Sequence, residues 1–294
     1  MITMIKIMDY KIFTKSLFRG IGQVMFQNNA LTGFLFLVGI FCASWLMGVG
    51  ALIGVLIGTL TALLFGYKEK DITDGLYGFN GVLVSIALLF LFNPTILLFI
   101  FIILAVVLSV VVMNFMYAKK FSPYTFPFVL TTWIFIFLIT FFNISTFNIS
   151  DTINFAKINI LSGVALGFSQ VMFQASIITG LIFFIAVLIN SRISAIYALV
   201  GSLVGLLFSL LFFPYSLNLI NIGIFGFNGV LCGIAFVDKK SYSFIFALIS
   251  IVLSTIIIYG FIGLNLIALT APFVFATWIT MFVRSKIQKN VVNI

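Results

Sequence analysis

The stretch PTILLFIFIILAVVLSVVVMNFMY, residues 94–117, decides the fold of this chain and contains no charged residue. An α-helix of this length extends about 36 Å, and the hydrocarbon core of a bilayer is about 30 Å thick. Backbone groups in lipid must be hydrogen-bonded within their own segment, so an apolar run of this kind forms a helix and not a strand. These residues are therefore predicted to cross a membrane.

Similar runs recur along the whole chain, whose 294 residues are 63% hydrophobic and only 7% charged. A soluble domain needs roughly a quarter charged residues to cover its surface, so an aqueous fold is excluded. Two shorter and more polar segments, at about 20–30 and 163–175, each precede a set of five predicted crossings. The ten crossings are expected at about 31–47, 50–66, 75–92, 94–117, 125–142, 176–190, 195–213, 222–237, 241–260 and 262–283.

The net charge of +9 would suit a nucleic-acid or lipid surface, but the basic residues follow the positive-inside rule instead. With the N-terminus inside, fourteen of the fifteen basic residues are cytoplasmic and only Lys157 is outside. The cytoplasmic set is Lys6, Lys11, Lys15, Arg19, Lys68, Lys70, Lys119, Lys120, Arg192, Lys239, Lys240, Arg284, Lys286 and Lys289. We therefore expect a multi-pass protein of the cell (inner or plasma) membrane, with both termini cytoplasmic, the lipid bilayer as partner and no nucleic acid bound.

The residues that usually hold metals or perform catalysis are scarce. There is no histidine, and Cys42 and Cys232 both lie in apolar runs, where a small buried hydrophobic role is expected. The sequence predicts no metal, no cofactor and no catalytic residue, because no nucleophile–base or metal-ligand cluster is apparent. A membrane enzyme or a lipid-binding receptor is the alternative from another class.

Four blocks of sequence occur twice, in the same order and about 147 residues apart. QVMFQ stands at 23–27 and 170–174, GFNGVL at 78–83 and 226–231, A-L-x-G at 51–54 and 198–201, and T-x-P-F-V-x-x-T-W-I at 125–134 and 270–279. With five crossings in each half, the second half must insert upside down relative to the first. Inverted repeats are an architecture of transporters, with the pathway at the repeat interface near the midplane.

This pattern predicts an all-α integral membrane fold of two inverted homologous repeats of five transmembrane helices, and it requires that the two short segments either enter and leave the membrane on the same side or lie flat. The predicted parts are a cytoplasmic N-terminal segment (1–19), a first membrane repeat (20–145), an extracellular linker (146–160), a second, inverted membrane repeat (161–283) and a cytoplasmic C-terminal tail (284–294).

The charged residues suggest what kind of solute passes. None of them is placed deep in a predicted crossing, whereas ion-coupled carriers and sites for charged substrates usually have ionisable groups there. A neutral solute that moves passively is therefore expected. Coupling to sodium through backbone and hydroxyl oxygens stays open.

The repeated polar residues are uncharged, and each needs a partner or a wet cavity when buried. For Asn80 and its repeat Asn228, a helix-capping or interhelical bond is the favoured interpretation. For Gln23 and Thr125, with their repeats in the second half, pore lining and structural hydrogen bonding both stay open. Pro127 and Pro272 are expected to free backbone carbonyls that could line a water-filled path.

The repeated phenylalanines lie beside these polar residues. Paired aromatic faces would form a slot for a flat molecule, and oxygens along the edge of the slot would accept hydrogen bonds from its N–H groups. The residues concerned are Phe26, Phe79, Phe173 and Phe227.

In these blocks the sequence resembles the urea transporter family. The resemblance rests on G-x-G-Q-V-M-F-x-N-N at 20–29, G-F-N-G-V-L at 78–83 and T-x-P-F at 125–128, each echoed in the second half, and it covers about residues 20–282. It implies that each repeat has an additional half-spanning segment, and that the protein is a homotrimer in which each protomer has its own urea pore at the repeat interface. It also implies a filter in which a ladder of oxygens runs between phenylalanine-lined slots.

Carried over by motif, the resemblance assigns a role to each residue of the filter. The ladder ends are Gln23 and Gln170; the central hydroxyls are Thr125 and Thr270; the slots use Phe26, Phe79, Phe173 and Phe227; and the apolar walls are Val24, Val171, Leu83 and Leu231. The chain departs from the family pattern at Ser122 and Ile267, where a proline usually stands. Passive, channel-like transport of urea is the expectation. The alternatives are permeation of short amides, ammonia or water through the same pore, or a cation-coupled secondary transporter.

Overall fold

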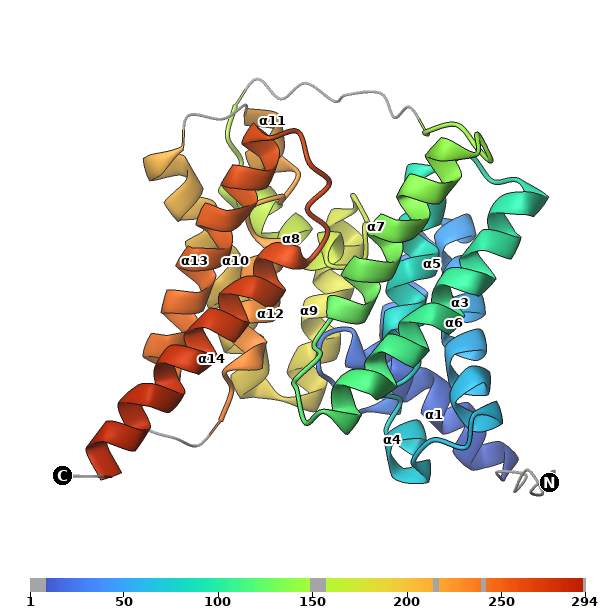
Figure 1. Ribbon diagram of the computed structural model, residues 1–294. Coiled ribbons are helices and arrows are strands. Elements are labelled where there is room, and N and C mark those ends of the chain that lie inside the picture. The colour runs from blue at the N-terminus through green and yellow to red at the C-terminus, as the bar shows by residue number, and fades with distance from the viewer. Residues whose placement is uncertain (1–8, 149–156, 214–216, 239–241, 293–294) are drawn as a thin grey trace. The chain divides into compact units, whose positions relative to one another are not determined.

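The computed structural model describes residues 9–148, 157–213, 217–238 and 242–292, and within these ranges the ordered structure is helical with no strand. The chain divides into two compact units, residues 1–151 and 152–294 (Figure 1). The first unit holds α1 (Tyr10–Gln23), α2 (Ala30–Ala43), α3 (Trp45–Leu64), α4 (Glu69–Thr73), α5 (Phe79–Leu91), α6 (Ile96–Ala118) and α7 (Phe126–Phe141). The second holds α8 (Ile160–Gln170), α9 (Ile177–Asn190), α10 (Arg192–Phe212), α11 (Leu217–Asn221), α12 (Phe227–Ala235), α13 (Ser243–Gly263) and α14 (Ala271–Val292).

Four helices of the described residues are long and apolar enough to cross a membrane, namely α3, α6, α10 and α13. Five shorter apolar helices accompany them: α2, α5, α7, α8 and α9. The prediction of ten full-length helical crossings is therefore wrong in detail, because several apolar runs are only partly helical.

The clearest differences are at predicted crossings 75–92 and 222–237. In the structure α5 begins at Phe79 and α12 spans only Phe227–Ala235, so the two helices rise about 20 Å and about 14 Å. The preceding residues form turns that contain Gly75 (φ +78°) and Gly223 (φ +80°), in the left-handed region that favours glycine. These turns are buried and therefore apolar. For this reason the hydropathy pattern joined each turn and the helix after it into one predicted crossing.

Helices also extend beyond the predicted repeats at both ends of the chain. The short segment predicted at 20–30 covers only the end of α1 and the turn and loop that follow it. The helix begins at Tyr10 and carries Lys11, Lys15 and Arg19 at four-residue spacing. Such a charged stripe lowers the mean hydropathy of an amphipathic helix, which hides it from a search for apolar runs. The structure likewise places the segment predicted at 163–175 at α8, 160–170.

The predicted tail from residue 284 is also helical, since α14 continues to Val292. Arg284 is 4% exposed there, pairs with Asp238 at 2.9 Å and lies over the Phe246 ring. A buried arginine needs such a partner, and the sequence pattern had placed it in a solvated tail. Lys6, Lys239, Lys240, Asp151 and most of the predicted linker lie outside the described residues.

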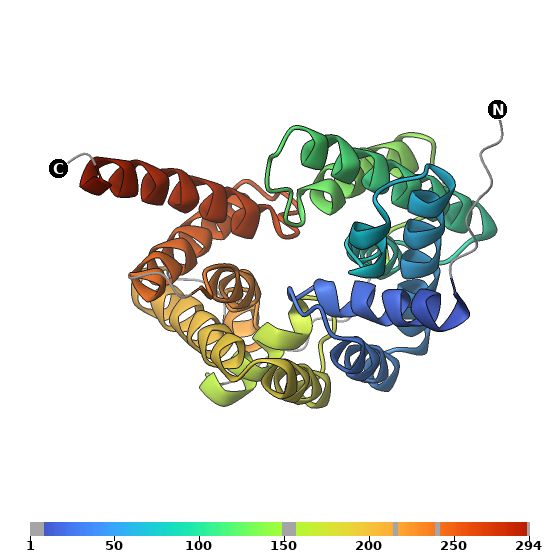
Figure 2. The same ribbon diagram turned by 90° about the horizontal axis from the view of Figure 1, so that it is seen from below.

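Within each unit, a close contact between two helices is made through glycines. A Cβ on Gly54 of α3 would lie 2.1 Å from the carbonyl oxygen of Gly81 on α5, and a Cβ on Gly201 of α10 would lie 2.0 Å from that of Gly229 on α12. Small residues of this kind let two helix backbones approach closely. The GFNG helices are thus pressed against long, membrane-length helices. In the first unit α1 is seen along its length in Figure 2, whereas α2 is seen nearly end-on, so these two helices cross steeply.

Candidate functional site

The first QVMFQ block forms the C-terminal end of α1. Gln23 is the last helical residue, the Phe26 N–H donates to the Gln23 carbonyl (3.0 Å), and the Gln27 N–H donates to the Gly22 carbonyl (3.1 Å). These two bonds are the Schellman pattern, which normally has glycine in the left-handed position. Here that position is held by Phe26, with φ of +59°. A non-glycine residue in this region costs roughly 1–2 kcal/mol.

The second unit repeats this arrangement at the end of α8. The Phe173 N–H donates to the Gln170 carbonyl (3.1 Å), the Gln174 N–H donates to the Ser169 carbonyl (3.0 Å), and Phe173 has the same φ of +59°. Strained residues persist where the surrounding structure and the function require them. The same phenylalanine is therefore held in a strained backbone at the same place in both units.

The GFNG asparagines cap the helices that follow the threonines. In the first unit the buried Asn80 Oδ1 accepts from the Phe128 N–H at 3.2 Å, and in the second the Asn228 Oδ1 accepts from the Phe273 N–H at 3.2 Å. Both donors belong to the first turn of a helix, where N–H groups have no intrahelical partner. The predicted capping role of the asparagines is confirmed, and each cap fixes the start of its helix.

The capped helices begin directly after the two predicted central threonines. Thr125 is the N-cap residue of α7 and Thr270 directly precedes α14; both are buried. Pro127 falls in the first turn of α7 and Pro272 in that of α14. A first-turn proline interrupts no intrahelical bond. The prediction that these prolines free carbonyls inside a helix is therefore wrong.

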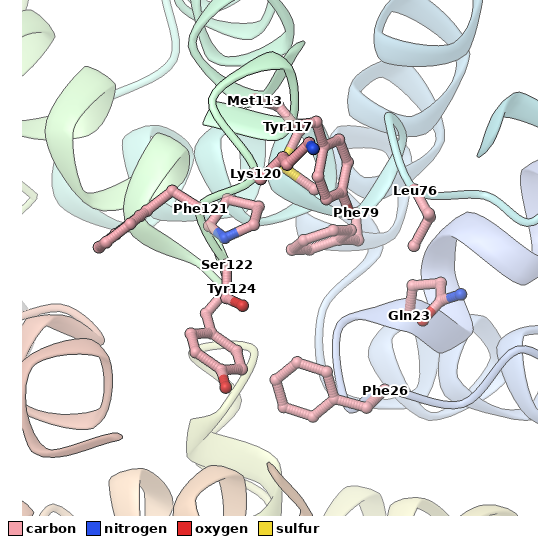
Figure 3. Close-up of a pocket in the computed structure, with 11 residues that line it drawn as sticks. Gln23, Phe26, Leu76, Phe79, Met113, Tyr117, Lys120, Phe121, Ser122 and Tyr124 are labelled. Atoms are coloured by element: carbon pink, nitrogen blue, oxygen red, sulfur yellow. The ribbon is translucent and has the colours of Figure 1, made fainter. Parts of the chain in front are cut away.

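A pocket of about 400 Å³ lies within the first unit (Figure 3). It brings together three predicted site residues, Gln23, Phe26 and Phe79. The other predicted residues of this unit, Val24, Leu83 and Thr125, are fully buried and are not part of its lining. The remaining lining residues were not predicted as site residues and are Leu76, Met113, Tyr117, Lys120, Phe121, Ser122, Pro123 and Tyr124.

An aromatic partner of Phe26 in this pocket is Tyr124. The two rings meet edge to face, with centroids 6.0 Å apart and planes at 88°, and Figure 3 shows them opposite each other. Tyr124 also has a left-handed backbone, with φ of +47°. Its position directly before the repeated threonine was the only signal in the sequence, because the second block has Leu269 there.

The Gln23 amide has a fixed orientation. Its Nε2 donates to the backbone carbonyl of Asp74 at 2.9 Å, and a carbonyl can accept only from the NH₂ end of an amide. The Gln23 oxygen therefore points the other way, and in Figure 3 the nitrogen lies on the far side of the side chain from the pocket. The pocket thus combines aromatic rings with an amide oxygen able to accept hydrogen bonds.

Tyr67 lies between α3 and α4 and packs against a second tyrosine. The rings of Tyr67 and Tyr77 lie 5.2 Å apart, and the Tyr77 hydroxyl donates to the Asn114 Oδ1 at 3.0 Å. Burial raises the pKa of Tyr67 above its usual 10, and its hydrogen bond to Asn114 opposes that shift. The Tyr67 phenol is therefore neutral at physiological pH.

The predicted residues of the second unit occupy equivalent places along its helices. Gln170 ends α8 and is half-buried, as is Phe173, whereas Val171 is buried in the turn that follows. Phe227 and Leu231 are buried in the first turns of α12.

Comparison with known proteins agrees with these features. The family model for urea transporters matches residues 14–285. The chain belongs to the urea transporter family. As a member of a family of transporters it is not an enzyme, as predicted, and its apolar helices make it a multi-pass membrane protein.

Individual members of the family match a shorter stretch. Urea transporter 1 of Ovis aries and that of Capra hircus are each 39% identical to this chain over 74 residues, and that of Mus musculus is 38% identical over 74 residues. Each match covers 25% of this chain and 19% of the relative. The match therefore spans about a fifth of the length of these urea transporters.

Proposed function

We propose that this protein is a passive, channel-like facilitator of urea across the cell membrane. The observation that carries the proposal is the match of the urea transporter family along almost the whole chain, residues 14–285. The curated relatives that it matches are named for urea transport.

The pocket of the first unit supports the proposal chemically. Urea is flat and neutral, and its four N–H groups need acceptors once its water is removed, because an unmet polar group costs a few kcal/mol. The pocket offers the Gln23 amide oxygen beside the rings of Phe26, Phe79 and Tyr124. An aromatic wall beside an acceptor admits a planar donor, whereas one amide oxygen cannot replace the several water ligands of a hydrated cation.

The full filter is proposed to use equivalent residues from both halves. The oxygens come from Gln23, Gln170, Thr125 and Thr270; the slots from Phe26, Phe79, Phe173 and Phe227; and the apolar walls from Val24, Val171, Leu83 and Leu231. The matching Schellman ends, asparagine caps and glycine contacts of the two units support two homologous repeats. We propose that these repeats are inverted, that each protomer of a homotrimer has its own pore at the repeat interface, and that both termini are cytoplasmic.

Urea efflux from proteoliposomes tests this proposal. The purified protein is reconstituted, the vesicles are loaded with urea, and efflux is followed by stopped-flow light scattering against protein-free vesicles. Efflux well above that of the empty vesicles is expected. Urea efflux equal to that of empty vesicles, together with rapid water or ammonia flux, would assign the pore to another solute.

A further inference from the structure

The end of α1 is held by a set of polar contacts around Asp74. The Asp74 carbonyl accepts from the Gln23 side chain at 2.9 Å, and its carboxylate accepts from the Asn28 Nδ2 at 2.9 Å. Arg19 lies 3.7 Å from the same carboxylate oxygen, and its Nη1 donates to the Thr73 carbonyl at 3.0 Å. We call Arg19, Asn28 and Asp74 the clamp.

Close backbone packing explains why this carbonyl reaches Gln23. Gly20 lies one turn before Gln23 on the same side of α1, and a Cβ on Gly75 would lie 2.3 Å from the Gly20 backbone nitrogen. The turn that starts at Asp74 is therefore pressed against the α1 backbone. In this position the Asp74 carbonyl faces the side chain that ends the helix.

The clamp belongs to the first unit alone. The second unit keeps the backbone arrangement, since a Cβ on Gly223 would lie 2.5 Å from the Gly167 backbone nitrogen. The residues that correspond to Arg19, Asn28 and Asp74, however, are Leu166, Ala175 and Ile222. None of these three side chains can form an ion pair or a hydrogen bond. Gln23 and Gln170 therefore lie in similar backbone arrangements, but only the turn beside Gln23 is held by these polar side chains.

We propose that Asp74, held by Arg19 and Asn28, is a positioning residue that fixes the Gln23 amide with its oxygen toward the pocket, so that the first repeat supplies the preorganised end of the urea pathway. This inference rests on the proposed function. A free amide can turn over and present its NH₂ group, which would repel the N–H groups of urea. An amide whose oxygen already faces the solute does not lose conformational entropy each time a urea molecule binds.

The ion pair itself is a minor part of this effect. Arg19 and Asp74 side chains are each 26% exposed, and partly exposed pairs contribute little free energy because water screens them. The clamp acts instead by joining three segments, namely α1, the loop after it and the turn before α5. The direct bond to Gln23 then comes from a backbone carbonyl whose place these segments fix.

The test compares Asp74→Ala with Asp71→Ala in proteoliposomes. Both remove one carboxylate from neighbouring positions, but no side-chain contact joins Asp71 to Gln23 among the hydrogen bonds of the described residues. Urea permeability should fall by roughly three- to tenfold in Asp74→Ala, the factor that one oriented hydrogen bond supplies. It should stay near wild type in Asp71→Ala. Asn28 is exposed, so Asn28→Ala is a mild change that provides a second test if Asp74→Ala expresses poorly. It should cause part of the same loss of urea permeability.

A double-mutant cycle separates positioning from a general structural role. In a Gln23→Ala background, Asp74→Ala should cause no further loss of urea permeability, because the amide that it positions is gone. Asp74→Asn, which keeps an oxygen for Asn28, should recover part of the flux. Equal permeability of Asp74→Ala and Asp71→Ala, or an undiminished Asp74→Ala effect in the Gln23→Ala background, overturns the inference. Absence of urea flux in the wild type would instead refute the proposed function.

Discussion

Replacing Asn80 with alanine tests whether the asparagine cap holds α7 in place. The Asn80 side chain is 1% exposed and supplies the acceptor for the buried Phe128 N–H, 3.2 Å away. Alanine leaves that donor without a partner, which costs about 1–3 kcal/mol of unfolding free energy. The contact of the Asn80 Nδ2 with the Met113 sulfur, at 3.5 Å, is weak and adds little.

The second unit provides the matched comparison. Asn228→Ala removes the same kind of cap from Phe273, but the Asn228 Nδ2 is buried without a partner in the structure. Alanine thus removes one unsatisfied group while it creates another, so the loss should be smaller than for Asn80→Ala. Ser85→Ala on α5 is the control, because its hydroxyl is buried without a partner; its replacement should be neutral or slightly stabilising.

Equilibrium unfolding in mixed micelles, followed by circular dichroism, measures these differences. Asn80→Ala should lose about 1–3 kcal/mol, Asn228→Ala less, and Ser85→Ala nothing. Urea permeability per folded Asn80→Ala protein should also fall, since Thr125 stands at the end of the uncapped helix. Asn80 does not hold α7 in place if Asn80→Ala is as stable as Ser85→Ala, or if Asn228→Ala loses more stability than Asn80→Ala.

Further predictions concern packing and the filter. Gly54→Ala should prevent folding, because its Cβ would lie 2.1 Å from a carbonyl oxygen of α5, and the loss of folded protein should appear as loss of a monodisperse gel-filtration peak. Gly260→Ala is the control: its Cβ would meet nothing within 4 Å, so the peak should stay intact. Thr125→Val or Thr270→Val should lower urea efflux from liposomes while the oligomer persists, because valine keeps the volume but lacks the hydroxyl; unchanged efflux in both would place the filter elsewhere. Phe26→Gly relaxes a left-handed backbone (φ +59°), which relieves roughly 1 kcal/mol of strain, but it also removes the ring contact with Tyr124, which contributes about 0.5–1.5 kcal/mol. These two effects nearly cancel, so the melting temperature should change little. Urea permeability of the same variant should change severalfold, and a large fall in melting temperature with normal permeability would show that Phe26 only packs.

Many of the helices could be predicted from the sequence, because an apolar segment long enough to cross a bilayer must form a helix there. Residues 94–117 were expected to form a helix, and α6 spans Ile96–Ala118. Hydropathy failed where burial in protein and burial in lipid look alike, as in the apolar turns before α5 and α12. Hydropathy also failed for α1, because the charged residues on one face of this helix lower its mean hydropathy and the average does not show that the other face is apolar.

The candidate site was predictable only where the sequence repeats itself. Gln23, Phe26 and Phe79 recur in the second half, and all three line the pocket. Tyr124 and Lys120 also line it, but the second half has Leu269 and Asn265 in their places. Both residues have left-handed backbones, with φ of +47° and +57°, and so do Leu269 and Asn265, with φ of +49° and +53°. The backbone conformation is therefore repeated where the residue type is not, and a comparison of sequence blocks does not detect it.

The most direct test of passive urea transport is uptake of labelled urea into sealed proteoliposomes, with and without imposed sodium and proton gradients. A passive urea channel gives uptake faster than in protein-free vesicles, at the same rate under every gradient, and this uptake stops when the internal and external urea concentrations are equal. Uptake that needs a gradient and accumulates urea above the external concentration would contradict a passive channel, and uptake no faster than in protein-free vesicles would contradict urea transport itself.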